Sequence, residues 1–557
     1  MDRRATLKTL FGGQASTRQN RLTMAAPPVI TSGLDPYTGP WELQQASHLL
    51  RRTMLGPTLE QIKQTQAAGM QATVAQLLQV LPPLDPPVNH FFEDDPNVPI
   101  GQTWIEAPYS QTTNFIPYRL ASLGGWMFGA MLQEGISLRE KMALFWHNHF
   151  VTAEINDARF RYRYYETLRE YSVGNFRDLT KAMTVDPSML RYLNGNQNTK
   201  NAPNENYARE LLELFTVGKG ELADPGDYTT FTEQDVVEIA KVLTGWRDTG
   251  YVSPNDSVPV GNLFLPNQHD TTTKQLSHRF GEATISNGGD QEYSQLIDII
   301  FESDAVATFI CRKLYRWFVF YEIPEEVEQN VIAPMAQCLR DNDYEIAPVL
   351  EALLQSEHFY DSLNYGVMIK NPLDFVLSTV KSNQVVYPDQ NLAIQYTAWF
   401  ESIAALNEMQ MGFFAHPSVA GWKAYYQEPL FYRHWINAVT LPLRMDVTTA
   451  LATTGISIFG QTLIIDVLGQ VAALENPADP NALIDELSLL LFPLPVTENQ
   501  RDYFKNILIN GLPDFEWTVE YSDYASDPQN SVLAASVENK LRNLYRAMLN
   551  MSEFYLS

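Results

Sequence analysis

The stretch SLREKMALFWHNHFVT, residues 137–152, shows the kind of element from which this chain is built. Ser137 stands three residues before Glu140, the spacing of a capping box, in which each side chain bonds a backbone N–H at the start of a helix. Asn148 tolerates left-handed dihedral angles, and the segment after it gives no strong helical continuation. We therefore expect a helix that begins at the capping box and ends near residues 148–151.

The same stretch contains two histidines, His147 and His149, which are candidate metal ligands or acid–base groups. On an unbroken helix, residues two apart point about 200° apart, so both rings reach one ion only if the helix ends between them. We expect one ring to face a cleft formed with a second helix, and the other to orient it or to bond a backbone group. A carboxylate from Glu205, Glu210 or Asp270 would lie within reach of the ring in the cleft. One metal ion held by both rings is the alternative.

Amphipathic helical patterns recur on both sides of this stretch. In WELQQASHLLRRTML, residues 41–55, one face carries Leu43, Ala46, Leu49 and Leu50, and the dipeptide Gly56-Pro57 ends the pattern. Further helical patterns occur at 176–193, 204–217, 232–246, 291–300, 304–321, 325–341, 346–356, 372–382, in several pieces over 391–475, and at 481–492 and 532–550.

Two regions depart from this helical series. Residues 247–290 are rich in Gly, Pro, Asn and Thr, which favours an ordered loop excursion with short strands. Residues 1–38 are polar and rich in small residues, which is typical of a flexible arm. The sequence thus predicts a mainly α fold, with one large elaborated helical domain at 39–557, long irregular loops and a few short strands.

The composition excludes several classes of partner. Of 557 residues, 45% are hydrophobic and 19% are charged, as in an ordinary globular protein. The net charge of −26 repels nucleic acid and anionic membranes, so we expect neither as a partner. No uninterrupted run of 18 apolar residues is present, so no transmembrane segment is expected. The two cysteines, Cys311 and Cys338, lie in apolar helical segments and are expected to be free thiols.

The N-terminal segment MDRRATLKTLFGG resembles a twin-arginine export signal in its Arg3-Arg4 pair. It lacks the long apolar segment of such a signal, because Lys8 and later polar residues interrupt it. Export to the periplasm and a flexible, uncleaved arm are both open, and a cytoplasmic location is not excluded.

Common catalytic signatures are missing from the sequence. It contains no GxSxG nucleophile elbow, no GxxxxGK phosphate loop, no CxxC pair and no HExxH zinc motif. The sequence therefore does not support a serine hydrolase of that type, a P-loop nucleotide enzyme or a zinc protease of that type.

A second polar cluster is NGNQNTKNAPNENYARELLELF, residues 194–215. Asn204 is expected to cap a helix, and Arg209 is spaced to pair with Glu205 or Glu213 on its surface. One interpretation is a capped helix with a solvated, charged face. The other is a helix start that binds an anion or a polyol, because amide side chains crowd the segment before the cap.

Two further segments carry candidate binding residues. In HDTTTK, His269, Asp270 and Lys274 form either a binding loop or a simple turn that Asp270 caps. In HPSVAGWKAYYQEPLFYRHWIN, residues 416–437, aromatic side chains around Trp422 form either a platform for a sugar or peptide, or a lid over the core.

These motifs and others occur in an order that resembles one bacterial family, known as domain of unknown function 1800. The motifs are HLLRRTMLGPT, ALFWHNHFVT, MLRYLNGNQN, PNENYARELLELFTVG, DVVEIAKVLTGWR, HDTTTK, RKLYRWFV, HPSVAGW and RHWIN. The resemblance reaches from about residue 43 to the closing LNMSEFYLS, which implies one elaborated family domain.

The resemblance also has implications for location and partners. Members of the family are often exported, and their genes often neighbour a family that resembles alkaline-phosphatase and sulfatase folds. It therefore implies an exported or periplasmic protein with a partner of that type, and it names no reaction. This chain departs from the family in its interrupted export signal, and in a threonine where members more usually carry glycine after Asp270.

We expect a metal-assisted hydrolase that acts on an ester or a polysaccharide-linked group and uses a divalent metal ion. The predicted catalytic residues are His147, His149, Glu205, Arg209, Glu210 and Lys274. The predicted substrate-binding residues are Asn204, Asn206 and Trp422. The predicted metal ligands are His147, His149, His269 and Asp270. The alternative is a non-catalytic envelope or assembly protein that binds a partner hydrolase or a carbohydrate, with its polar clusters serving as buried networks.

Overall fold

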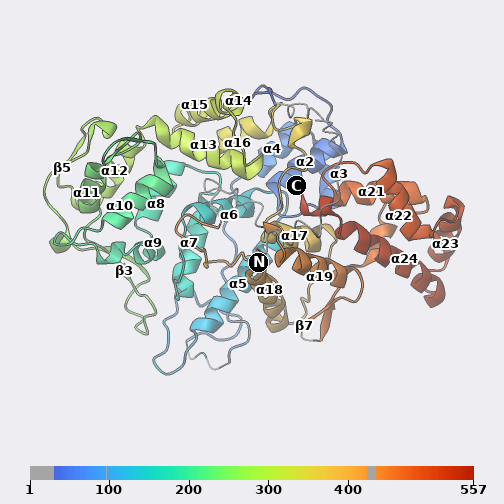
Figure 1. The fold of residues 1–557 in the computed structure, drawn as a ribbon. Coiled ribbons are helices and arrows are strands. Elements are labelled where there is room, and N and C mark those ends of the chain that lie inside the picture. The colour runs from blue at the N-terminus through green and yellow to red at the C-terminus, as the bar shows by residue number, and fades with distance from the viewer. Residues whose placement is uncertain (1–29, 94, 96, 423–434, 459) are drawn as a thin grey trace, which may run out of the picture.

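Helices dominate the computed structural model, which describes residues 30–93, 95, 97–422, 435–458 and 460–557 (Figure 1). Strands are few and short, so the prediction of a mainly α fold is confirmed. Most of the predicted N-terminal arm, residues 1–29, lies outside the described part of the chain. Residues 30–38 are held in place, because Pro36 forms a β-bridge with Ser356 and the Tyr37 N–H donates to the carbonyl of Gln355 at 2.8 Å.

The middle of the molecule is built from helices that are far apart in sequence (Figure 1). Helices α5 and α18 pack along each other there, and α6 packs against α7. The bounds of these elements are α2 (Leu43–Thr53), α3 (Leu59–Ala68), α4 (Met70–Leu77), α5 (Ile116–Gln133), α6 (Arg139–His149), α7 (Ala158–Glu170), α17 (Pro372–Ser382) and α18 (Leu392–Glu408).

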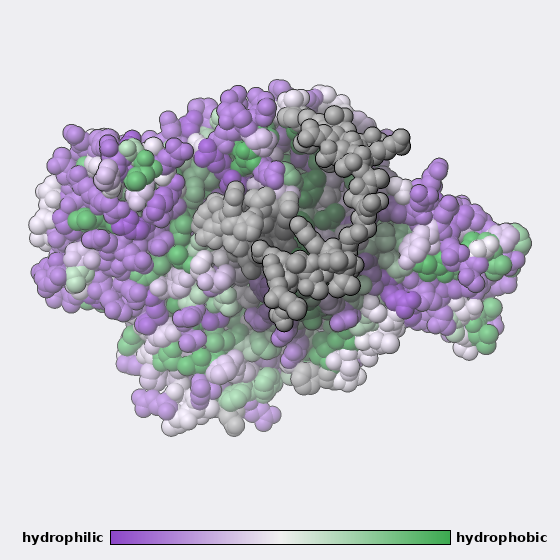
Figure 2. All heavy atoms as spheres, viewed as in Figure 1, coloured by the Kyte–Doolittle hydropathy of each residue, from purple (hydrophilic) through white to green (hydrophobic). Residues whose placement is uncertain are grey.

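One lobe, at the left of Figure 1, contains the helices and strands that follow α7. Its surface is largely hydrophilic (Figure 2). Its helices are α8 (Phe176–Thr184), α9 (Pro187–Tyr192), η1 (Gly195–Gln197), α10 (Glu205–Glu210), the π-helix η2 (Leu211–Thr216), α11 (Glu233–Val242), η3 (Pro266–Gln268), η4 (His278–Phe280), η5 (Gly289–Gln291) and α12 (Glu292–Ile300).

The strands form two-residue to four-residue antiparallel pairs. Within the predicted excursion at 247–290, β3 pairs with β4 from Trp246 opposite Phe264 to Thr249 opposite Gly261. The predicted short strands are therefore present. The strands are β1 (Leu222–Asp224), β2 (Asp227–Tyr228), β3 (Trp246–Thr249), β4 (Gly261–Phe264), β5 (Lys274–Gln275), β6 (Thr284–Ile285), β7 (Ile456–Ile458) and β8 (Gln461–Leu463).

Helix α13 connects the lobe to the middle of the molecule and carries side chains that line a candidate site. Its buried residues recur every three or four positions, so one face packs into the core, and Ser303 caps its start. The helices of this region are α13 (Asp304–Phe318), α14 (Glu325–Val327), the π-helix η6 (Glu328–Ile332), α15 (Ala333–Asp341), α16 (Ile346–Leu354) and η7 (Ser362–Asn364).

Helices α21 to α24 form the end of the molecule opposite this lobe, and α19 lies nearer the middle (Figure 1). Helix α24 contacts α19, α20, α22 and α23, and so holds this end together. The bounds are α19 (Thr440–Ala452), α20 (Val467–Ala472), α21 (Pro480–Leu491), α22 (Glu498–Ile509), α23 (Asp514–Ser526), α24 (Ser531–Leu549) and η9 (Ser552–Tyr555).

A continuous cluster of buried apolar side chains runs from Ala46 to Tyr555 and includes the fully buried Trp104, Trp146 and Trp517. Both cysteines are free thiols in the structure. No helix among the described residues is long and apolar enough to cross a membrane.

Helix α6 ends at His149, within the predicted range of residues 148–151, but the predicted capping box does not form. The Ser137 hydroxyl does accept the N–H of Arg139 at 3.0 Å. Glu140 is turned into the core, where its carboxylate accepts a charge-assisted bond from Arg169 at 2.9 Å. A buried guanidinium thus outcompetes the backbone N–H for this carboxylate.

Candidate functional site

His147 is fully buried and bonded on both ring nitrogens. Its Nδ1 lies 3.0 Å from the hydroxyl of Tyr164, which donates its own proton to the carbonyl of Phe150 at 2.6 Å. Nδ1 must therefore carry the proton, and Nε2 accepts the N–H of Phe414 at 3.4 Å. Burial, with smaller contributions from His416 and Arg161, lowers the pKa of His147 well below 6.5. This ring is a neutral, packed side chain.

His149 is also buried, in a different setting. Its Nε2 donates to the carbonyl of Phe215 at 3.1 Å, which leaves Nδ1 to accept from Lys313 Nζ at 2.9 Å. Burial and then the nearby Lys313 lower the pKa of His149 well below 6.5. Both nitrogens are engaged by the protein, so His149 has none left for a metal ion.

The segment HDTTTK contributes to a buried ion cluster instead of an open loop. His269 bonds the carboxylate of Glu292 through Nε2 at 2.8 Å and the carbonyl of Thr244 through Nδ1 at 2.9 Å. Lys274, fully buried, donates to the same Glu292 at 2.6 Å. Asp270 caps the turn by accepting the N–H of Thr272 at 2.8 Å, as in the simpler interpretation of this segment. We call the three side chains His269, Glu292 and Lys274 the Glu292 cluster.

The structure does not bring the four predicted metal ligands together. In the described part of the chain, no three His, Cys, Asp or Glu side chains meet in a way that could hold a metal ion. His147, His149 and His269 each bond a different set of partners, and Asp270 bonds its own turn.

The second helix is capped as predicted, because Asn204 accepts the N–H of Asn206 at 3.0 Å. The predicted pairing of Arg209 is different: it binds Glu233 of α11 through two parallel bonds of 2.8 and 2.7 Å, and reaches Glu213 only at 3.9 Å. A bidentate pair fits the guanidinium better than a neighbour on the same helix does. Glu205 and Asn206 are exposed.

The amides before this helix bond other parts of the protein. Asn198 donates to the carbonyl of Ala240 at 3.0 Å, and Asn196 donates to Asp248 at 2.5 Å. The amide of Asn204 donates to the carbonyl of Leu193 at 2.8 Å. These amides brace the segment against its neighbours, in keeping with the simpler of the two interpretations.

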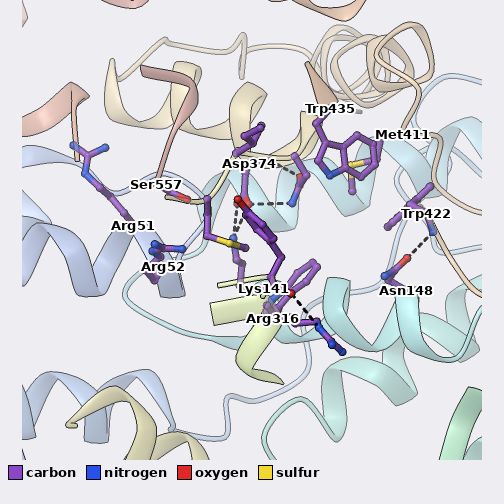
Figure 3. Close-up of a pocket in the computed structure, with 15 residues that line it drawn as sticks. Arg51, Arg52, Lys141, Asn148, Arg316, Asp374, Met411, Trp422, Trp435 and Ser557 are labelled. Atoms are coloured by element: carbon purple, nitrogen blue, oxygen red, sulfur yellow. Dashed lines mark hydrogen bonds and ion pairs between the residues drawn. The ribbon is translucent and has the colours of Figure 1, made fainter. Parts of the chain in front are cut away.

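A hollow that the sequence did not indicate lies in the middle of the molecule, where α2, α6, α13 and α17 meet (Figure 3). Its volume is about 70 Å³, which is room for roughly five water molecules at about 10–15 Å³ each. We call it the cationic pocket. It is lined by Arg51, Arg52, Lys141, Asn148, Arg316, Trp317, Tyr321, Met368, Ile369, Asn371, Asp374, Met411, Trp422, Trp435 and Ser557.

Positive side chains outnumber negative ones in this pocket, in a protein whose net charge is −26. Asp374 is the one carboxylate side chain among the lining residues, against four cations. It is fully engaged: Lys141 Nζ lies 2.7 Å from each of its oxygens, and Asn371 donates to it at 3.0 Å. Figure 3 shows this pair in the middle of the pocket, with Arg51 and Arg52 to one side.

The two arginines of α2 are buried without a carboxylate partner among the described residues. Arg51 donates to the carbonyls of Leu489 and Leu490 at 2.9 and 2.6 Å. Arg52, 3% exposed, donates only to the carbonyl of Asn364, at 2.5 Å. Burial lowers the pKa of Arg52 to about 9 and that of Arg51 to about 10.

Unpartnered atoms of the cationic pocket are all donors. Arg52 Nε, Arg52 Nη1 and Trp317 Nε1 are buried and have no hydrogen-bond partner within the described chain. No acceptor atom of a lining side chain is left in that state. Because a buried unpaired polar group is costly, this imbalance points to an acceptor-rich ligand.

The opposite wall of the pocket is formed by Asn148, the residue between the two histidines. Asn148 accepts the backbone N–H of Trp422 at 2.8 Å. The approach is close at Gly421, where a Cβ would stand 2.4 Å from Asn148 Oδ1 and where φ is +97°, so only glycine fits. Trp422 is 4% exposed and stacks on His416 with 4.0 Å between ring centroids. It is therefore a core residue whose ring also borders the pocket; its neighbours at 423–434 lie outside the described residues.

A larger hollow adjoins this pocket through Arg316, which lines both. We call it the groove; its volume is about 1250 Å³. Its walls include Lys313 of α13 and Glu210, a predicted catalytic residue. Burial, and then the neighbouring Glu213, raise the pKa of Glu210. Of the predicted site residues, Glu210 thus reaches the groove directly and His149 touches its wall through Lys313.

The sequence patterns did not indicate a site at Arg51, Arg52, Lys141 and Asp374. A signal was present in the first helix, where two arginines directly follow Leu49-Leu50 in a stretch otherwise suited to the core. Buried arginines are rare unless paired, so an arginine pair at apolar positions marks a candidate site. The four helices that bring these residues together are too distant in sequence for spacing to indicate it.

Comparison with known proteins gives a family and no activity. No curated protein and no solved structure is similar enough to this chain to be matched. The family model described as "Protein of unknown function (DUF1800)" matches residues 48–555, nearly the whole chain. The match includes the residues of all four helices that line the cationic pocket, from Arg51 onward. The chain therefore belongs to the DUF1800 family.

Proposed function

We propose that this protein binds a ligand through an oxyanion group (carboxylate, phosphate or sulfate) held in the cationic pocket. The observation that carries the proposal is the set of buried donors without partners, Arg52 Nε, Arg52 Nη1 and Trp317 Nε1. Oxyanions offer several acceptor atoms in a compact group, and arginine binds them with strong, charge-assisted bonds. A pocket of about 70 Å³ suits such a group and leaves the rest of the ligand outside.

The pocket wall supplies a surface for the remainder of the ligand. Trp317, Trp422 and Trp435 line the same pocket as the arginines. Aromatic side chains beside a charged anchor suit a ring-bearing ligand such as an acidic or esterified sugar. This supports the carbohydrate-binding alternative more directly than it supports a metal-assisted hydrolase.

The hydrolase prediction remains a proposal with less support. Hydrolysis of an ester or a glycosidic linkage commonly needs a free general base or an activated water. The one carboxylate side chain of the pocket, Asp374, is held by Lys141 and Asn371. An alkaline-phosphatase-like partner and an exported location likewise remain proposals.

Titration of the purified protein with inorganic phosphate, sulfate and glucuronate tests the proposal, followed by tryptophan fluorescence or calorimetry. We expect saturable binding that weakens at least about tenfold in Arg52→Met, since a charged hydrogen bond contributes roughly 1.5–3 kcal/mol. Glucose is the neutral control ligand. Arg177→Met is the matched protein control, because Arg177 lies on α8, is partly exposed and pairs with Asp343 at 2.7 Å. Equal binding by wild type and Arg52→Met, or no binding by wild type, would refute the proposal.

A further inference from the structure

Lys313 has an environment unlike that of any other lysine on the groove. It is half-buried on α13, and its Nζ donates to His149 Nδ1 at 2.9 Å and to the carbonyl of Leu214 at 3.1 Å. The same nitrogen lies 4.6 Å from the centre of the Phe309 ring. Both acceptors are neutral, and no described carboxylate lies within ion-pair distance of it.

The number of acceptors matches an uncharged amine. A neutral –NH2 has two protons, which His149 Nδ1 and the Leu214 carbonyl accept, whereas an ammonium group has a third. Because His149 Nε2 is fixed as a donor to Phe215, its Nδ1 keeps a lone pair toward Lys313. His149 is thus a positioning residue for the amine.

The charged groups around Lys313 do not stabilise the protonated form of its amine. Arg316, one turn further along the same face of α13, repels a second positive charge, and Arg312 is paired with Glu328. Of the carboxylates that precede the Leu214 carbonyl on the groove wall, Glu213 is paired with Lys219 at 3.1 Å, and Glu210 makes no ion pair with Lys313. Burial first, and then Arg316, lower the pKa of Lys313 to about 7.

We propose that Lys313 is a nucleophilic amine at the wall of the groove, which condenses with the aldehyde or ketone group of an anionic ligand to form an imine. Its Nζ lone pair attacks the carbonyl carbon while the carbon–oxygen π electrons move to oxygen. The carbonyl oxygen then leaves as water with the two protons that nitrogen loses, and a C=N bond replaces C=O. No oxidant or reductant is needed, so the step balances as amine plus carbonyl giving imine plus water. Arg316, three residues away on the groove wall, is placed to attract the anionic part of the ligand.

Reductive trapping on the full chain tests this assignment. The probe is 4-formylbenzoate, an aldehyde with a carboxylate, and cyanoborohydride converts any imine to a stable secondary amine that peptide mass spectrometry locates. Lys219 is the internal control: it lines the same groove, is half exposed and has a pKa raised by its bond to Glu213. At pH 7 we expect Lys313 to be labelled at least about tenfold faster than Lys219, because about half of an amine with that pKa is unprotonated, against less than about 0.1% of an ordinary lysine.

The pH profile and two variants sharpen the test. Labelling of Lys313 should reach half its maximal rate near pH 7, and Lys313→Arg should abolish that labelled peptide alone. Arg52→Met should leave the rate at Lys313 unchanged, which separates this site from the cationic pocket. Labelling of Lys313 no faster than Lys219, a rate that rises only above pH 9, or a tenfold loss in Arg52→Met would overturn the assignment to the groove.

Discussion

Two groups of buried charge in this protein are assembled in opposite ways. In the Glu292 cluster, one carboxylate accepts from His269 and Lys274, and all three side chains are at most 1% exposed. In the cationic pocket, Arg52 is nearly as buried, but two of its nitrogens bond nothing in the described structure. The charged groups of the Glu292 cluster bond one another. The cationic pocket has unbonded donors, which a ligand with acceptor atoms could bind.

The difference in bonding suits the Glu292 cluster to stabilising the fold and the cationic pocket to binding a ligand. A buried charge that is paired and fully bonded contributes to a unique fold, and removing one member leaves the other without compensation. A buried charge with spare donors destabilises the empty protein slightly and is compensated when a ligand binds. The segments with the most conspicuous polar residues in the sequence belong to the first kind.

The largest expected effect is in the Glu292 cluster. Lys274→Met should lower the free energy of unfolding by roughly 3–5 kcal/mol, because it leaves the buried Glu292 carboxylate short of its cation. Urea denaturation at pH 7 measures this. Lys219→Met is the control, since its exposed pair with Glu213 should be worth no more than about 1 kcal/mol. A loss below 1 kcal/mol for Lys274→Met would mean that the Glu292 cluster stabilises the fold no more than an exposed ion pair does.

An effect of intermediate size is expected in the pH dependence of stability, from the buried His416, which stacks on Trp422 of the pocket. Burial lowers the pKa of His416 to about 3, so between that pH and 6.5 the unfolded chain binds a proton that the native chain does not. Stability is therefore lost as pH falls from 6.5. The fall in unfolding free energy between pH 7 and pH 5 should be about 2 kcal/mol smaller in His416→Phe than in wild type.

The difference between proteins, and not the total slope, is the quantity to compare in that experiment. Burial raises the pKa of Asp186 to about 7 and that of Glu134 to about 8, and such carboxyls act in the opposite direction. They are unchanged in His416→Phe, and phenylalanine keeps a ring against Trp422. Identical slopes for the two proteins would mean that His416 is charged in the folded state.

Much of the fold could be predicted from local patterns. The periodicity of apolar residues gave helices such as α2, and Asn204 caps its helix as expected, because these features depend on neighbours within one or two turns. The capping box at Ser137 failed for a reason that is not local: Arg169, which is distant in sequence, takes the Glu140 carboxylate. Likewise, Arg209 pairs with Glu233 of another helix.

The candidate site was less predictable for the same reason. His147 and His149 are candidates by residue type, because histidine is the side chain most often used in acid–base catalysis. Their burial and bonding depend on Tyr164, Phe215 and Lys313. The pocket joins residues 51–52, 141–148, 316–317 and 374, whose proximity is a result of helix packing. The sequence shows which side chains are capable of chemistry. The packing of the helices determines which of them are left without hydrogen-bond partners.

A smaller effect is expected at Asn148, on the far wall of the pocket. Asn148→Asp keeps an oxygen to accept the N–H of Trp422 but adds a negative charge that faces the arginines' ligand. Phosphate affinity should fall roughly three- to tenfold, on the order of 1 kcal/mol for a like charge across a partly screened distance. Asn342→Asp, at the exposed end of α15, is the control with the same change of charge. Unchanged affinity in Asn148→Asp would place the anion elsewhere.

The smallest effect is the most direct test of the comparison, and it concerns the stability of Arg52→Met. This substitution is the chemical counterpart of Lys274→Met, since each replaces a buried cation with an unbranched apolar side chain. Arg52 makes one bond, to the carbonyl of Asn364, and its guanidinium carries a desolvation cost that lowers its pKa to about 9. The substitution removes both the hydrogen bond, which stabilises the protein, and the desolvation cost, which destabilises it. These two effects should nearly cancel, so we expect the unfolding free energy to change by less than about 1 kcal/mol in either direction. In phosphate buffer, the wild type should gain stability according to the occupancy of its pocket, while Arg52→Met should gain none, because a ligand stabilises only the state that binds it. If Arg52→Met instead costs as much as Lys274→Met in phosphate-free buffer, then Arg52 is a structural residue and the two groups of buried charge are of one kind.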